Sequence, residues 1–253
     1  MLLLCTNDDG ILARGLECLE RSARPLGDVF VVAPDREQSA TSHSLTLHHP
    51  LRPVRLGENR WQVDGTPTDC VLLAIEALMP ARPDFVLSGV NHGPNMGEDV
   101  LYSGTVAAAM EGLALGVPAI AFSFAGKHAL SDGSLLEQHV EGLSRLLAHL
   151  TSLPDFPPHT LLNVNVPAIP VAMLRGVKLT KLGQRVFSDS IRKMEDPWGR
   201  PIYWVGGGSV TWTDDEGTDV RAVEAGYVSV TPLHLDVTHR ARLDDAERWW
   251  RAP

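Results

Sequence analysis

Short apolar runs alternate with longer amphipathic segments along most of the chain. The runs have the length of buried strands, and the segments have the period of helices that pack through one face. The runs predict strands over residues 1–6, 29–33, 85–87, 117–122 and 161–166. The amphipathic segments predict helices over residues 13–24, 67–79, 106–115 and 135–150. This alternation is typical of an α/β fold, in which helices cover both faces of a mostly parallel sheet.

Two segments depart from the alternation. Residues 51–63 predict a small hairpin, and residues 176–213 return to β character with several aromatic residues and a glycine turn at 206–208. Exposed aromatic residues on such an arm favour a subunit contact. Residues 240–251 predict a terminal helix within a C-terminal helical segment over 233–253. We therefore expect one α/β domain over residues 1–253, with a protruding β-rich arm at about 176–213.

Composition narrows the class of protein. The chain is 44% hydrophobic and 21% charged, which is ordinary for a globular protein. The net charge of -9 argues against nucleic acid as a partner. The three cysteines are unpatterned, which argues against a disulfide framework or structural zinc. No apolar stretch approaches the roughly 18 to 20 residues of a membrane span, and the apolar start is too short for a signal peptide, so we expect a cytoplasmic protein without a membrane partner.

Two adjacent carboxylates follow the first predicted strand, at Asp8 and Asp9. Each raises the pKa of the other unless a cation compensates their charge. A divalent ion with oxygen ligands is a natural compensation. The alternative is a helix N-cap or a polar turn, since Asp and Asn favour both.

Two further polar loops follow predicted strands, and such loops meet at the ligand-binding edge of a parallel sheet. Ser39 lies in a hydroxyl-rich loop, where its oxygen can join a metal shell or simply bond to the loop's own backbone. Asn91 and Asn95 lie in a glycine-containing loop over residues 88–95, where an Asn carbonyl offers a neutral ligand. The alternative for this loop is a turn-rich connection.

Ser103, Gly104 and Thr105 directly precede a strongly helical run. Free backbone N–H groups and the helix dipole at such a position favour an anion such as phosphate. Ser103 can also be a helix cap, and the two roles are compatible. The chain lacks the glycine-rich dinucleotide and P-loop motifs, the zinc-protease motif and the G-x-S-x-G motif. Together, the loops match metal-assisted phosphate chemistry.

As an ordered set, these motifs resemble the SurE family, the stationary-phase survival proteins. The matching segments are residues 7–10, 33–35, 38–41, 88–95 and 103–106, with later matches at 162–167 and 226–232. The resemblance therefore extends over nearly the whole chain. One departure is Ser42, where the family often has glycine.

The resemblance implies a Rossmann-like fold and a metal-dependent 5′-nucleotidase that acts on nucleoside 5′- and 3′-monophosphates, with possible activity on short polyphosphate. It implies one divalent ion per subunit, Mg²⁺ or Mn²⁺, and a homodimer or homotetramer assembled through the C-terminal β-rich extension. The implied metal ligands are Asp8, Asp9, Ser39 and Asn91. The implied phosphate-binding residues are Asn95, Ser103, Gly104 and Thr105.

For catalysis we hypothesise attack by a metal-activated water, with Asp8 or Asp9 orienting or deprotonating that water. One alternative function is a non-catalytic nucleotide- or metal-sensing module that uses the same pocket. Another is a protein–protein scaffold whose working surface is the aromatic arm.

Overall fold

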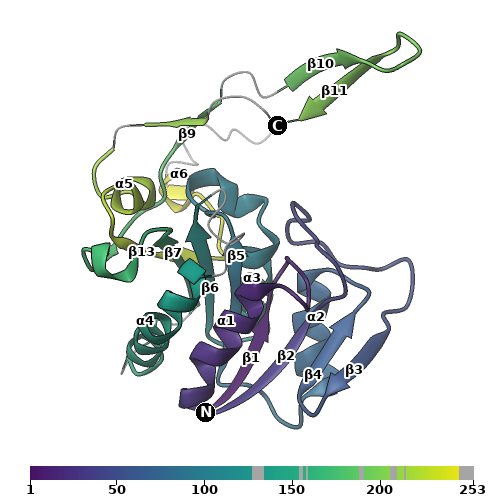
Figure 1. Ribbon diagram of the computed structural model, residues 1–253, viewed down its shortest axis with the longest axis vertical. Helices are drawn as coiled ribbons and strands as arrows, with labels where there is room; N and C mark the ends of the chain where they lie inside the picture. Colours follow the sequence, from purple (N-terminus) through teal and green to yellow (C-terminus); the bar gives the residue numbers. More distant parts are fainter. Residues whose placement is uncertain are drawn as a thin grey trace.

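A single large sheet positions the loops that carry the candidate residues (Figure 1). The computed structural model describes residues 1–126, 134–153, 156–157, 159–187, 191–205, 210–213 and 215–244. Within these residues, nine strands join in the order β3-β4-β2-β1-β5-β6-β7-β13-β8. The run from β4 to β7 is parallel, while β3 is antiparallel to β4 and β13 is antiparallel to β7.

The bounds of the elements agree closely with the predicted pattern. The sheet strands are β1 (Leu2–Thr6), β2 (Asp28–Pro34), β3 (Pro53–Gly57), β4 (Arg60–Val63), β5 (Phe85–His92), β6 (Ala119–Ala125), β7 (Thr160–Pro167), β8 (Val177–Leu179) and β13 (Val228–His234). The helices are α1 (Arg14–Ala23), α2 (Pro67–Leu73), α3 (Gly104–Ala114), α4 (Ser134–Thr151), α5 (Asp219–Glu224) and α6 (Arg240–Asp244). Shorter helical turns are η1 (Arg24–Leu26), η2 (Ala74–Leu78), η3 (Gly97–Leu101) and η4 (Val171–Met173).

Apolar cores on both faces of the sheet explain why its strands read as continuous apolar runs. In β1, Leu3 faces the core formed with α1 and α4, and the next residue, Leu4, faces the core formed with α2 and α3. Both side chains are fully buried. The predicted fold class, a mostly parallel α/β sheet flanked by helices, is therefore confirmed.

The structure confirms the predicted hairpin, refines one predicted helix and adds a strand. The predicted 51–63 hairpin is confirmed as the antiparallel pair β3 and β4. The predicted 67–79 helix is α-helical only to Leu73 and continues as the wider turn η2. Strand β13 was not predicted, because Ser229, Thr231 and Pro232 interrupt its apolar run.

Within the segment predicted as the β-rich arm, residues 176–213, β8 joins the edge of the main sheet beside β13, and the remaining strands form two small antiparallel pairs. They consist of β9 (Arg185–Phe187) with β12 (Val210–Trp212), and β10 (Ile191–Glu195) with β11 (Pro201–Val205). Figure 1 shows the β10–β11 hairpin extending away from the main sheet. The glycine turn predicted at 206–208 lies outside the described residues. Within the predicted helical segment 233–253, β13 ends at His234, α6 is helical, and residues 245–253 lie outside the described part.

Strand order places a binding crevice at one point of the sheet. The chain passes from β1 to β2 on one side and later returns to β5 on the other side of β1. At such a reversal the loops after neighbouring strands diverge, which opens a crevice beyond their carboxyl ends. Asp8 and Ser39 lie in the loops that leave β1 and β2 at this position. Strand β5 extends to His92, so Asn91, predicted in a loop, lies near the carboxyl end of that strand. Among the described helices, a bilayer-spanning segment is absent.

Candidate active site

One open cavity gathers most of the predicted site residues. Its volume is about 680 Å³. The predicted residues that line it are Asp8, Asp9, Ser39, Asn91, Asn95 and Ser103. Gly104 and Thr105 lie directly behind this lining, where they pack against Asp8. The geometry thus brings the predicted metal-binding and phosphate-binding groups to one place.

Asp8 is held between the end of β1 and the start of α3. Its side chain is almost completely buried, and its Oδ1 accepts a hydrogen bond from the Thr105 hydroxyl. Gly104 makes this approach possible, because a Cβ at Gly104 would lie 2.8 Å from Asp8 Cβ and 3.0 Å from Asp8 Oδ2. The glycine therefore serves a close contact between the helix and the carboxylate.

Both carboxylates are electrostatically costly without a cation. Burial, opposed by the Thr105 hydrogen bond and aided by the charge of Asp9, raises the pKa of Asp8 to about 6. Burial also raises the pKa of Asp9, although the backbone N–H of His92 donates to Asp9 Oδ2 at 3.1 Å. Glu37 adds a further repulsion to Asp9. A bound cation would relieve these costs.

The two neutral candidate ligands have hydrogen bonds that orient their oxygens. Ser39 donates its hydroxyl proton to Glu37 Oε1 at 2.6 Å, so the lone pairs of Ser39 Oγ remain for a cation. Asn91 donates from Nδ2 to the Gly93 carbonyl at 2.9 Å, which leaves Asn91 Oδ1 as its acceptor. The irregular register of β5 between Ser88 and Asn91 re-aims Asn91 at the strand end.

This donor set fits a hard divalent ion. It offers two carboxylates, a hydroxyl and an amide oxygen, and Mg²⁺ is commonly held by one or two carboxylates together with water. Within the described residues, no group of three His, Cys, Asp or Glu side chains comes together as a metal site. The predicted set contains only two side chains of those types, so it represents a different kind of metal site.

The start of α3 provides the candidate anion site. Ser103 is the N-cap, and its Oγ accepts from the Val106 backbone N–H at 3.1 Å. The N–H groups of Gly104 and Thr105 come earlier in the helix, and the first N–H groups of a helix have no partner within it. Since both the hydroxyl and the backbone N–H of Thr105 act on the Asp8 carboxylate, the backbone N–H of Gly104 is the one best suited to phosphate.

Ser42, where the family often has glycine, has a left-handed backbone conformation. Ser42 has a φ of 53°, in the left-handed region that glycine enters most easily. Its hydroxyl donates to the Leu101 carbonyl at 2.7 Å. This bond joins the loop that contains Ser39 to the turn that precedes α3. The serine side chain, which a glycine would lack, therefore helps to hold the loop in place.

Several lining residues were not among the predicted ones. They are Glu37, Ala40, His92, Pro94, Asp99, Tyr102, Arg185 and Val205. Four of them lie in the loops that carry the predicted motifs: Glu37, Ala40, His92 and Pro94. Their position in the sequence close to predicted site residues could have indicated them. Arg185 and Val205 come from the β-rich arm, and no local sequence signal connects them to the crevice.

Arg185 is fixed to the site by two acidic residues of η3. Its backbone N–H donates to Glu98 Oε2 at 2.7 Å, and its guanidinium Nη1 donates to Asp99 Oδ1. Nearby, the fully buried Asp219 accepts from the backbone N–H groups of Gly97 at 2.9 Å and Gly183 at 2.8 Å. The arm therefore meets the candidate site through defined hydrogen bonds.

The charge of the cavity lining favours a cation as well. Its carboxylates belong to Asp8, Asp9, Glu37 and Asp99, while Arg185 provides a guanidinium. A phosphate dianion placed among these groups would meet a net negative field. An additional positive charge between the carboxylates and the phosphate would reverse that field.

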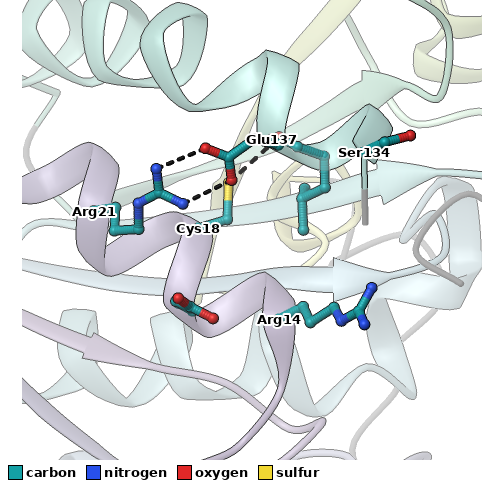
Figure 2. Close-up of a pocket in the computed structure, with 7 residues that line it drawn as sticks. Arg14, Cys18, Arg21, Ser134 and Glu137 are labelled. Atoms are coloured by element: carbon teal, nitrogen blue, oxygen red, sulfur yellow. Dashed lines mark hydrogen bonds and ion pairs between the residues drawn. The ribbon is translucent and has the colours of Figure 1, made fainter. Parts of the chain in front are cut away.

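A second cavity of about 450 Å³ lies between α1 and α4 (Figure 2). The Arg21 guanidinium donates two hydrogen bonds to the Glu137 carboxylate, at 2.7 and 2.6 Å. Figure 2 shows this pair bridging the two helices, with Arg14 apart from it. Because Arg21 and Glu137 neutralise each other and are about half exposed, this cavity is better explained as a joint between helices.

Comparisons with known proteins identify the family that this chain resembles over its length. A family model described as "Survival protein SurE" matches residues 3–189. The chain is 69% identical to the 5′-nucleotidase SurE of Gemmatimonas aurantiaca over 253 residues, with 100% of both chains covered. It is 48% identical to the 5′-nucleotidase SurE of Geobacter metallireducens, covering 98% of this chain and 97% of the relative. The crystal structure of the SurE protein from Aquifex aeolicus superposes with a TM-score of 0.85 at 40% identity, covering 98% and 99% of the two chains.

Proposed function

The chain belongs to the SurE family, and from this membership we propose that it is a 5′-nucleotidase that uses one divalent metal ion, Mg²⁺ or Mn²⁺, per subunit. The observation that carries the proposal is the meeting of Asp8 and Asp9 with the start of α3 in one cavity. A carboxylate pair and a helix N-terminus are the two parts that metal-assisted phosphate chemistry requires.

Asp8, Asp9, Ser39 and Asn91 would hold the ion. When bound, it would supply positive charge beside the phosphate and favour the deprotonated form of a nearby water. The N–H groups at the start of α3, with the side chain of Asn95, would hold the phosphate oxygens. These donors lie where negative charge increases as the phosphate is attacked, so they stabilise the transition state.

The reaction is hydrolysis of a phosphate monoester. The oxygen of water forms a bond to phosphorus, the bond between phosphorus and the ribose oxygen breaks, and that oxygen takes up a proton as it leaves. We propose that Asp9 accepts the proton of the attacking water, because Asp8 is more deeply buried and its Oδ1 already accepts from Thr105. Asp9 Oδ2 accepts from His92 and has a second lone pair that would bind the ion, which leaves Oδ1 of Asp9 for the proton.

The cavity is much larger than a phosphate group, and this supports a nucleoside as the rest of the substrate. Tyr102 and Val205 also line it and offer apolar surface to a base. Nucleoside 5′-monophosphates are the proposed main substrates. We extend the proposal to 3′-monophosphates and short polyphosphate, which present the same terminal phosphate.

We also propose that the protein assembles with itself, as a dimer or tetramer, through the arm. Trp198, Tyr203 and Trp204 of the β10–β11 region are 78%, 60% and 63% exposed. Apolar surface of this kind on a protruding hairpin is typical of a subunit contact. Light scattering of the purified protein would show a dimer or tetramer, and substitution of Trp204 by Asp would reduce the measured mass.

Phosphate release from AMP and GMP, measured with and without Mg²⁺ or Mn²⁺, tests the proposed activity. We expect release that depends on the metal and is lost in Asp9→Asn. Asp28→Asn, exposed at the start of β2, is the matched control and should retain activity. Tight nucleotide binding without phosphate release would instead support a sensing module.

A further inference from the structure

Two asparagines in the middle of the sheet have no role in the site described so far. Asn163 and Asn165 are alternate residues of β7, so their side chains point to the same face. Both are fully buried. Burying an amide in a sheet core is costly unless hydrogen bonds compensate it. The hydrogen-bond partners of the two asparagines therefore indicate their role.

Both side chains hold the backbone of Asn95. Asn165 Oδ1 accepts from the Asn95 backbone N–H at 2.9 Å, and Asn165 Nδ2 donates to the Asn95 carbonyl at 3.0 Å. Asn163 Nδ2 donates to the same carbonyl at 2.8 Å. Three hydrogen bonds from two sheet residues therefore fix the backbone of a loop residue 68 to 70 positions away in sequence.

A third buried residue orients the side chain of Asn95. Ser123 on β6 pairs with Asn165 on β7, and its Oγ accepts from Asn95 Nδ2 at 2.8 Å. An amide nitrogen carries two N–H bonds, and Ser123 accepts one of them. The second N–H is thus given a fixed direction at a residue that lines the cavity.

We propose that Asn163, Asn165 and Ser123 are positioning residues that act through Asn95, setting its amide in the geometry that binds the phosphate of the substrate. This rests on the proposed function, since it assumes that Asn95 contacts phosphate. The anchors belong to central strands of the sheet, whereas Asn95 lies in a loop. A group that must be held to a fraction of an ångström gains from such a rigid support.

A double-mutant cycle tests the proposal through kcat/KM for AMP. Ser123→Ala removes the acceptor for Asn95 Nδ2 and should lower kcat/KM about tenfold, as loss of a supporting hydrogen bond commonly does. In an Asn95→Ala background the same change should have no further effect. Ser22→Ala, equally buried but in α1, where its hydroxyl donates to the Cys18 carbonyl, is the control and should leave kcat/KM unchanged. An equal loss in both backgrounds, or no loss at all, would overturn the proposal.

A measurement independent of turnover separates this proposal from the proposed function. The chain has only six asparagines, so selective ¹⁵N-asparagine labelling resolves the side-chain amides by NMR. We expect the Asn95 side-chain protons to exchange slowly with solvent in the wild type and at least tenfold faster in Ser123→Ala. Unchanged exchange would refute the anchoring. If the wild type released no phosphate from AMP, the proposed function would fail. The exchange rates would still decide whether Ser123 holds the Asn95 side chain.

Discussion

The Thr105 hydroxyl donates a hydrogen bond to Asp8 Oδ1, and this bond joins the first turn of α3 to the carboxylate that follows β1. The helix that presents N–H groups to an anion is thereby fixed relative to a proposed metal ligand. Both residues are buried, so water does not readily replace the bond.

Replacing Thr105 by Val should therefore impair the site while keeping its shape. The change leaves Asp8 Oδ1 without its donor, and the loss of a supporting hydrogen bond to a metal ligand commonly costs about 10- to 100-fold in affinity or activity. Titration with Mn²⁺ and AMP hydrolysis measure the two effects. Thr105→Ser, which retains the hydroxyl, should recover most of both. Equal activity of Thr105→Val and the wild type would contradict this role.

Gly104→Ala should be more damaging than its size indicates. The added methyl group would lie 2.8 Å from Asp8 Cβ, and overpacking of this kind typically costs about 1–3 kcal/mol. We expect a lower urea midpoint together with a loss of phosphate release. Gly142→Ala in α4 is the matched control, since its new Cβ would meet nothing within 4 Å and alanine favours a helix. A tolerated Gly104→Ala would show that the close approach is not needed.

Local pattern was sufficient to predict much of this site. Asp8 and Ser39 lie in the loops after β1 and β2, and Asn91 lies near the end of β5. The apolar runs of these strands are easy to recognise, and parallel strands bring their ends together. The contact between Arg185 and Asp99 spans 86 residues and joins the arm to η3, so no local period or motif indicates it. The same is true of Asn165 and Asn95, which the sequence shows only as separate motifs.

Asp219 links the turn before β9 to the start of η3, beside the candidate site. Its buried carboxylate accepts from the backbone N–H groups of Gly97, Gly183 and Val220, at 2.9, 2.8 and 2.8 Å. Asp219→Ala leaves these donors without an acceptor, which should lower the free energy of unfolding by about 3 kcal/mol. It should also raise KM for AMP by displacing Arg185. Urea unfolding and steady-state kinetics check both effects, with the exposed Asp28→Ala as control.

His139 should make stability depend on pH. Burial lowers the pKa of His139 below its ordinary value of 6.5, against the opposing effect of the Ile169 carbonyl at 2.9 Å. The unfolded chain therefore takes up this proton first, so the contribution of His139 is complete above pH 6.5 and is lost as pH falls through the lowered pKa.

Urea unfolding at about pH 7.5 and about pH 5.5 tests this direction. The wild type should lose more stability between the two conditions than His139→Gln, which does not titrate there. His149→Gln, exposed on the same helix, should behave as the wild type. A larger loss in His139→Gln than in the wild type would reverse the assigned direction.

The central claim is that Asp8, Asp9, Ser39 and Asn91 bind one divalent ion beside the start of α3. Electron paramagnetic resonance of Mn²⁺ titrated into the metal-free protein measures this binding directly, because the signal of bound Mn²⁺ differs from that of the free ion. The account predicts one bound Mn²⁺ per chain in the wild type, its loss in Asp8→Asn, and its retention in Asp28→Asn. Undiminished binding of Mn²⁺ by Asp8→Asn would contradict it.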